Sequence, residues 1–176
     1  MSRSYFQLSS LAFSSALLAC CVSLSSIASA NNTATTLKSP AGANSMAPRL
    51  VTASDGKHWL SWLEREDKIN HLRISAFENG QFSPAQTIKS GSDWFANWAD
   101  TPHLFVDDKG WMVAQWLQKS GASTYAYDVS LSYSNDGGEH WSEALVPHDD
   151  GTASEHGFVS FFPHDQGAGM VWLDAG

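Results

Sequence analysis

Short apolar runs and polar turns alternate along residues 48–176. Clusters rich in Asp, Asn and Gly stand between the runs, for example at 54–57 and 107–110. Short apolar-aromatic runs bounded by turn residues are typical of β-strands, and no stretch shows convincing helical periodicity. The pattern predicts strands near 49–53, 58–63, 69–77 and 82–88, and again near 103–106, 111–117, 126–133 and 140–146.

The strand pattern repeats along the chain. A Trp-Leu pair occurs at 62–63, 116–117 and 172–173, so the three pairs are almost evenly spaced. A turn precedes each pair, and Pro48-Arg49-Leu50 returns at the same spacing as Pro102-His103-Leu104. A repeat of this length filled with four short strands is typical of a β-propeller blade.

The repeat predicts an all-β domain made of blades. We expect a first blade at about 48–92, a second at about 98–147 and the start of a third at about 156–176. A propeller closes its ring only with four or more blades. We therefore expect the sequence to be an amino-terminal fragment or a truncated product, unless copies associate to complete a ring.

Residues 134–141 fit the pattern Ser-x-Asp-x-Gly-x-x-Trp, with Ser134, Asp136, Gly138 and Trp141 at its fixed positions. In such a turn the Asp accepts hydrogen bonds from the following amides, Gly tolerates positive φ and the Trp covers the turn. The pattern resembles the Asp-box of the sialidase-like (BNR-repeat) β-propellers, and the resemblance covers about residues 48–176. It implies a propeller of about six blades in which these four residues are structural.

Topology separates this turn from the candidate site. Turns between strands one and two and between three and four share one rim of a propeller, and the remaining connections share the other. Segments 92–100, 125–128 and 147–156 reach that second rim and combine aromatic rings with carboxylates or imidazoles, as sugar-binding sites do. The catalytic candidates are Asp100, Glu155, His156 and Tyr127, and the substrate-binding candidates are Arg49, Trp94, Asn97, Trp98, Asp128 and Asp174.

The resemblance to sialidases implies specific roles. Sialidases use an acid/base Asp, a Tyr nucleophile activated by a Glu, and an arginine cluster that binds the substrate carboxylate. Asp100 fits the acid because it starts an inner strand beside Trp98, where burial would raise its pKa. Arg49 stands where the family has its first arginine, in a loosely matching context. The other arginines, the nucleophile and its Glu are expected beyond Gly176.

Each candidate also has a structural alternative. Asp100 could cap a turn, Glu155 and His156 could be a structural loop pair, and Tyr127 could be a packing residue. A divalent-cation site is a further alternative, although the spacing matches no compact ligand motif, so we expect no metal and no cofactor. The residues of that alternative are His148, Asp149, Asp150, Glu155 and His156.

The net charge limits which classes of partner the chain can bind, and the cysteine positions limit its thiol chemistry. The 176 residues are 43% hydrophobic and 16% charged, with a net charge of −8. An acidic chain repels phosphate backbones, so we expect a carbohydrate or glycoconjugate as partner and no nucleic acid. Both cysteines lie at positions 20 and 21, so the chain after position 30 has no thiol.

The first thirty residues resemble an export signal. Arg3 precedes an apolar, serine-diluted stretch, and Ala28-Ser29-Ala30 is a small-residue cleavage site. We expect a signal peptide at 1–30, a flexible linker at 31–47, and a periplasmic or secreted protein. The alternative is a lipoprotein, because the residues before Cys20 resemble a lipobox, and this anchor would be the chain's membrane contact.

Together these features predict an exported glycoside hydrolase of the exo-α-sialidase type that removes a terminal sugar from glycoconjugates. The fragment alone is expected to be inactive. The alternative is a non-catalytic propeller that binds glycans or takes part in envelope interactions.

Overall fold

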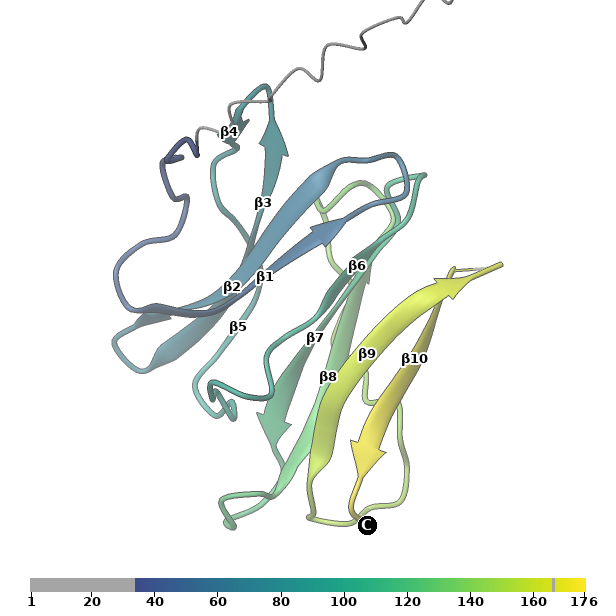
Figure 1. The fold of residues 1–176 in the computed structure, drawn as a ribbon. Helices are drawn as coiled ribbons and strands as arrows, with labels where there is room; N and C mark the ends of the chain where they lie inside the picture. Colours follow the sequence, from purple (N-terminus) through teal and green to yellow (C-terminus); the bar gives the residue numbers. More distant parts are fainter. Residues whose placement is uncertain (1–33, 166) are drawn as a thin grey trace, which may run out of the picture. The chain divides into compact units, whose positions relative to one another are not determined.

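The structure, a computed structural model, describes residues 34–165 and 167–176 and is all-β there (Figure 1). The described residues contain three antiparallel sheets, none closed on itself, and no helix. In the first sheet β1 (Ser45–Thr52), β2 (His58–Glu66) and β3 (Ile69–Glu78) follow in order, and β4 (Gln81–Phe82) and β5 (Gln86–Gly91) both pair with β3. The second sheet contains β6 (Leu104–Val106), β7 (Met112–Lys119) and β8 (Tyr127–Ser134), and the third contains β9 (His156–His164) and β10 (Gly167–Asp174).

The pairing registers repeat with the predicted period. Leu50 lies opposite Leu60 in the first sheet, and Leu104 lies opposite Ala114 in the second, so both partners are displaced by the same interval. The tryptophans of the three Trp-Leu pairs lie on β2, β7 and β10, each the second strand of its sheet. The predicted repeat of strands is therefore confirmed.

The predicted strand at 140–146 is wrong. In this segment Leu145 forms an isolated bridge with Leu131, and no strand is present. Tyr133 N donates a hydrogen bond to the Ser142 hydroxyl at 3.1 Å. In a regular sheet it would donate to a backbone carbonyl of the neighbouring strand. The segment then reaches Pro147, which has no N–H to donate. The Ser142 side chain thus interrupts the ladder, which keeps the backbone hydrogen bonds from Ser142 N to Tyr133 O and between Leu131 and Leu145.

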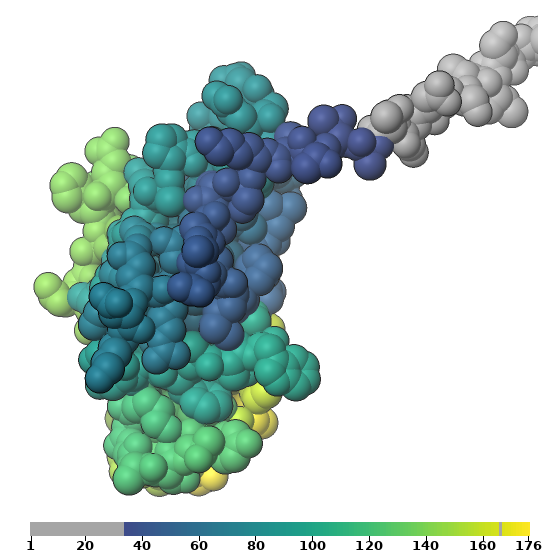
Figure 2. All heavy atoms as spheres, turned by 90° about the vertical axis from the view of Figure 1, so that its left-hand side faces the viewer, coloured from purple at the N-terminus to yellow at the C-terminus, as the bar shows by residue number. Residues whose placement is uncertain are grey.

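The expected flexible linker at 31–47 extends too far, because β1 already begins at Ser45. Before this strand, Gly42 N donates to Glu64 Oε2 at 2.8 Å, and Arg65 N donates to Asn44 O at 3.3 Å. In Figure 2 the dark-blue start of the described chain lies against the lighter-blue residues that follow it. Residues from about 42 onward are therefore fixed against β2.

Two apolar clusters lie between neighbouring sheets. The first joins the first and second sheets, and its buried members include Trp59, Leu72, Leu104, Met112 and Trp116. The second joins the second and third sheets through Leu117, Tyr127, Val129 and Val159. Strand β6 contacts both β1 and β9, so the first strands of the three sheets are neighbours. Successive blades of a propeller meet in this way.

The expected signal peptide at 1–30, with its alternative anchor at Cys20, lies outside the described residues. Among the residues that the structure does describe, no helix has the length and apolarity of a membrane span.

Candidate functional site

The strand connections lie at two ends of the second sheet. Gly137 N donates to Gly110 O at 3.2 Å, so the β6–β7 turn meets the turn that follows β8. Tyr127 begins β8 opposite Lys119, at the other end. A parallel bridge joins Tyr127 to Glu155, just before β9. The predicted separation of the Ser134–Trp141 turn from the candidate site is therefore observed in the second sheet.

Asp100 is buried at the junction between the second and third sheets. Its side chain is 4% exposed, and its Oδ2 accepts a hydrogen bond from Phe158 N at 2.9 Å. A methyl group on Gly157 would lie 2.0 Å from this oxygen and 3.1 Å from Tyr127 Cε2. Because only glycine allows this close approach, Gly157 helps to position Asp100 and Tyr127.

Asn97 shapes the loop that presents Asp100. Its Oδ1 accepts hydrogen bonds from Ala99 N and Asp100 N, both at 2.8 Å. This is a side-chain-capped turn, which fixes the backbone of Asp100 before β6 begins. Asn97 therefore positions the candidate acid.

Burial raises the pKa of Asp100, and the negative charge of Glu155 raises it further, whereas the hydrogen bond from Phe158 N opposes this shift. The other carboxylate oxygen, Oδ1, is buried and has no hydrogen-bond partner in the described structure. A carboxyl with one unused oxygen and a raised pKa is suited to holding a proton that it can donate.

Tyr127 and Glu155 form a direct pair. The Tyr127 hydroxyl donates to Glu155 Oε1 at 2.5 Å, and its ring stacks on Phe95 with 4.2 Å between centroids. Burial, followed by the hydrogen bond to Glu155 and the charges around it, raises the pKa of Tyr127 well above its ordinary value. The phenol is therefore protonated, with a carboxylate placed to accept its proton.

His156 points to a different set of partners from its neighbour Glu155, as successive residues of an extended segment do. Its ring is fully buried, with Nε2 at 2.9 Å from Asp150 Oδ2 and Nδ1 at 3.5 Å from Asp128 Oδ1. Asp174 Oδ1 lies 3.5 Å from Nε2, and the ring of His148 stacks on that of His156. The predicted Glu155–His156 pair thus separates into two groups of contacts.

Asp150 determines the charge state of this second group. Burial lowers the pKa of His156, but the hydrogen bond to Asp150 and the nearby negative charges outweigh it and hold the pKa above its ordinary value. The hydrogen bonds from His156 and Thr152 lower the pKa of Asp150.

The two candidate tryptophans differ in exposure. Trp94 is 9% exposed and stacks on Trp116 in the first apolar cluster, so its ring is packed in the core and does not face solvent. Trp98 is 89% exposed, and Tyr125, the first residue of the candidate segment 125–128, is 60% exposed. Both rings can therefore meet a ligand from solvent.

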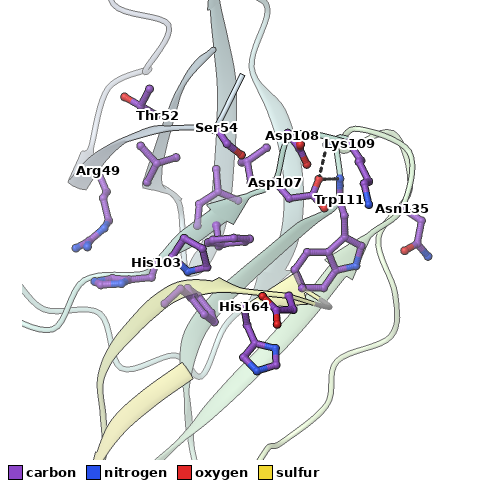
Figure 3. Close-up of a pocket in the computed structure, with 18 residues that line it drawn as sticks. Arg49, Thr52, Ser54, His103, Asp107, Asp108, Lys109, Trp111, Asn135 and His164 are labelled. Atoms are coloured by element: carbon purple, nitrogen blue, oxygen red, sulfur yellow. Dashed lines mark hydrogen bonds between the residues drawn. The ribbon is translucent and has the colours of Figure 1, made fainter. Parts of the chain in front are cut away.

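Arg49 does not share a cavity with Asp100. It lines a separate cavity of about 850 Å³ together with residues of β6 and β9, and this lining does not include Asp100, Tyr127 or Glu155 (Figure 3). Burial, and then the charge of Arg49, lowers the pKa of the adjacent His103 to about 4. Arg49 is therefore not brought together with the candidate acid.

The Ser134–Trp141 turn has the bonding expected of a structural element. Asp136 Oδ1 accepts from His140 N at 2.9 Å, and the Ser134 hydroxyl accepts from Gly138 N at 2.9 Å. Gly138 has a φ of 93°, and Trp141 Nε1 donates to its carbonyl at 3.1 Å. Each of the four fixed positions thus has a local bonding or conformational role.

Sequence reasoning missed the backbone contribution of Gly157 and Phe158 and the stacking of Phe95. A glycine inside an otherwise apolar strand signals close approach by another group, and this signal was present at 157. The sequence carries no comparable signal for the stacking partner of Tyr127.

No protein-family model matches the sequence, and no curated protein matches it significantly. Among solved structures, an endo-arabinase from Bacteroides thetaiotaomicron has a similar fold, with 14% sequence identity and a TM-score of 0.51. The match covers 73% of this chain and 50% of that chain, so this chain spans about half the length of the enzyme it matches. At this identity the likeness concerns the fold alone: an all-β chain similar to a β-propeller-type glycosidase.

Proposed function

We propose that the three sheets are blades of a sialidase-like β-propeller and that the protein is an exported glycoside hydrolase acting on a terminal sugar. The observation that carries the proposal is the 2.5 Å hydrogen bond from Tyr127 to Glu155, beside the buried carboxyl of Asp100. A tyrosine paired with a carboxylate, next to an acid, matches the nucleophile and acid of sialidase-type hydrolysis, although not its arginine cluster.

The chemistry follows from the bonding of each group. Glu155 accepts the phenolic proton while the Tyr127 oxygen attacks the anomeric carbon, and the glycosidic C–O bond breaks. Asp100 gives its proton to the departing oxygen. As a carboxylate, Asp100 then takes a proton from water, whose oxygen displaces the tyrosine and restores the phenol as Glu155 returns its proton.

Exposed aromatic rings on the same rim supply binding surface for the sugar. Trp98 and Tyr125 are both more than half exposed, and indole and phenol rings stack on the apolar faces of pyranoses. An anionic sugar would need arginine, and Arg49 lies in a different cavity. Neutral glycosides should therefore be tested beside the sialosides that the resemblance favours.

A non-catalytic glycan-binding propeller is the second candidate. It is favoured by the low exposure of Asp100, 4%, and of Tyr127, 1%, because buried groups must be uncovered before they can reach a glycosidic bond. In this case the exposed ring of Trp98 would bind the glycan and the buried polar groups would fix the loops.

Fluorogenic glycosides of sialic acid, arabinose and galactose, together with a glycan-binding assay, separate the two candidates when applied to a protein that contains the complete propeller. For a hydrolase, Asp100→Asn should lower turnover at least about 100-fold and leave glycan binding unchanged. Trp98→Ala should weaken binding for either candidate. Glycan binding without turnover of any glycoside, unaffected by Asp100→Asn, would refute the enzyme and support the binding protein.

A further inference from the structure

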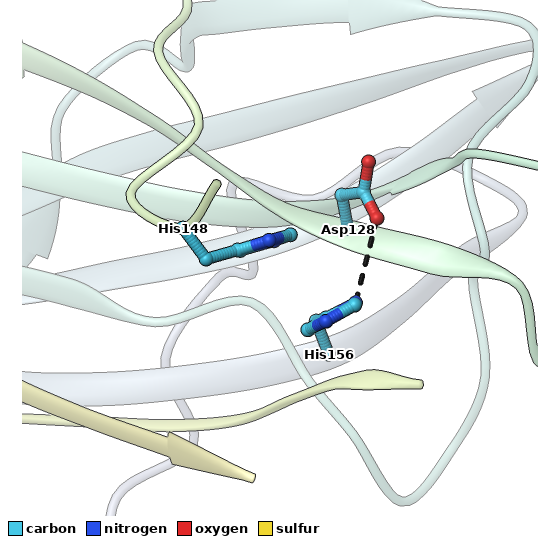
Figure 4. Close-up of side chains that lie close together, drawn as sticks. All are labelled: Asp128, His148 and His156. Carbon is cyan, nitrogen blue, oxygen red and sulfur yellow. Dashed lines mark ion pairs between the residues drawn. The ribbon is translucent and has the colours of Figure 1, made fainter. Parts of the chain in front are cut away.

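Four buried side-chain atoms that lack a hydrogen bond lie where β8, the loop at 146–154 and β9 meet. Two of them, Nδ1 of His148 and Nδ1 of His156, have a carboxylate oxygen 3.5 Å away. Asp128 Oδ1, His156 Nδ1 and both ring nitrogens of His148 are buried and make no hydrogen bond in the described structure. His156 is fully buried, and the His148 side chain is 7% exposed. Figure 4 shows the carboxylate of Asp128 beside the two imidazole rings. Unpaired buried polar atoms are costly, so a cluster of them needs an explanation.

The hydrogen bond of His156 Nε2 with Asp150 leaves Nδ1 as the ring nitrogen that faces Asp128. Because a carboxylate only accepts, Nε2 of His156 donates to Asp150 Oδ2, 2.9 Å away. Nδ1 of His156 faces Asp128 Oδ1 at 3.5 Å, which is an ion-pair contact and too long for a good hydrogen bond. A metal ion that replaces the proton on Nδ1 would bind to both atoms, so metal and protons compete for this position.

We propose that Asp128, His148 and His156 bind a divalent transition-metal ion, with Zn²⁺ as the ion that their donor set favours. Imidazole and carboxylate ligands suit zinc, and three protein ligands leave a fourth position for water. Asp150 takes the part of the outer carboxylate that orients a metal-bound histidine. This inference is independent of the proposed hydrolase activity and departs from the expectation of no metal.

The distances show which ligand must move. Bond lengths near 2.05 Å put neighbouring ligands of a tetrahedral zinc ion about 3.3 Å apart. The Asp128–His156 pair, at 3.5 Å, is already close to this spacing, whereas the three ligand atoms lie within 4.8 Å of one another. The ring of His148 stacks on that of His156 at 4.0 Å and 13°, so it must turn until its lone pair converges with the others. It lies in a loop rather than a strand, which allows this rotation.

The bound ion would connect the second and third sheets. Asp128 belongs to β8 and His156 begins β9, while His148 lies in the connection between them. The ion would add a cross-link to the parallel bridge between Tyr127 and Glu155. The ion would therefore raise the melting temperature of the chain whether or not the protein cleaves sugars.

The test uses the whole chain, freed of metal by a chelator and titrated with Zn²⁺ against a chromophoric chelator and with Co²⁺ by visible absorption. We expect one ion per chain, tetrahedral Co²⁺ bands and a rise in melting temperature. His148→Ala and Asp128→Asn should weaken Zn²⁺ binding by more than about 100-fold, and Asp150→Asn by about 10-fold, as expected for an outer partner.

His164→Ala is the matched control, because this exposed histidine lies at the opposite end of β9 and should leave binding unchanged. Circular dichroism and urea unfolding without metal show whether each variant folds, and the nearly isosteric Asp128→Asn covers the case in which His148→Ala does not. The proposal is overturned if the chain binds no Zn²⁺ at millimolar concentration, as a simply protonated His156 would require. It is also overturned if the two ligand variants bind as the unchanged chain does.

Discussion

Gly157→Ala is the sharpest test of how the candidate acid is held. The added methyl group would lie 2.0 Å from Asp100 Oδ2, which is far inside van der Waals contact, so the carboxylate must move. Moving it breaks the 2.9 Å hydrogen bond from Phe158 N. The same methyl would lie 3.1 Å from Tyr127 Cε2, a contact that a small shift can relieve.

The expected cost combines two effects. A lost hydrogen bond to a charged group costs about 1.5–3 kcal/mol, and overpacking a buried site costs about 1–3 kcal/mol. Because the carboxylate can relax partly toward the loop, we expect Gly157→Ala to lower the free energy of unfolding by about 3 kcal/mol. Asp100→Ala removes the clashing oxygen, so in that background the added methyl should cost about 1 kcal/mol or less.

Urea unfolding followed by tryptophan fluorescence measures both values, since the sequence contains eight tryptophans. The four proteins of the cycle are the unchanged chain, the two single variants and the double variant. A coupling energy of about −2 kcal/mol is expected. If Gly157→Ala costs the same with and without the Asp100 carboxylate, the methyl group does not act through Asp100 and the account of the site is refuted.

Three further outcomes are expected. Gly138→Ala should destabilise the chain by about 1–3 kcal/mol in urea unfolding, because its φ of 93° is strained for any residue with a Cβ; an unchanged midpoint would contradict this. Ser134→Ala should cost about 1–2 kcal/mol, since its hydroxyl bonds both Asp136 and Gly138, and a cost as small as that of an exposed serine would exclude this role. His103 has a folded pKa of about 4 against an ordinary 6.5, so the unfolded chain binds more protons and stability should fall as pH drops from about 6.5 to 4. The full shift corresponds to about 3.4 kcal/mol, reduced to about 1–2 kcal/mol by the ring's partial exposure, and His103→Phe should remove this pH dependence in unfolding curves.

The sequence was sufficient to predict the strands and their period because both depend on local pattern. Trp62, Trp116 and Trp172 each lie on the second strand of a sheet, and the register of Leu50 with Leu60 recurs one period later. The prediction failed at 140–146, where the Ser142 hydroxyl takes the hydrogen bond of Tyr133 N and interrupts the ladder. A pattern of apolar and polar positions contains no information about this competition.

The sequence could predict which residues lie near one another in the candidate site, but not which atoms they contact. Topology predicted Asp100, Tyr127 and Glu155 on one rim. In the structure Tyr127 donates to Glu155, and Asp100 and Tyr127 both lie against Gly157. Exposure was not predictable: Trp94 and Trp98 belong to one loop, yet Trp94 is in the core and Trp98 in solvent. The direction of each ring depends on partners such as Trp116 that are distant in sequence.

The second sheet is covered on both faces. The side chains of β7 therefore contact the interface with the first sheet on one face and the interface with the third sheet on the other. Met112, Ala114 and Trp116 face the first cluster, while Leu117 faces the second, so alternate positions sense opposite neighbours. The outer sheets can detach separately while β7 keeps one partner. Amide exchange should accordingly be slowest in β7, and truncations at odd and even positions along it should loosen different halves of the molecule.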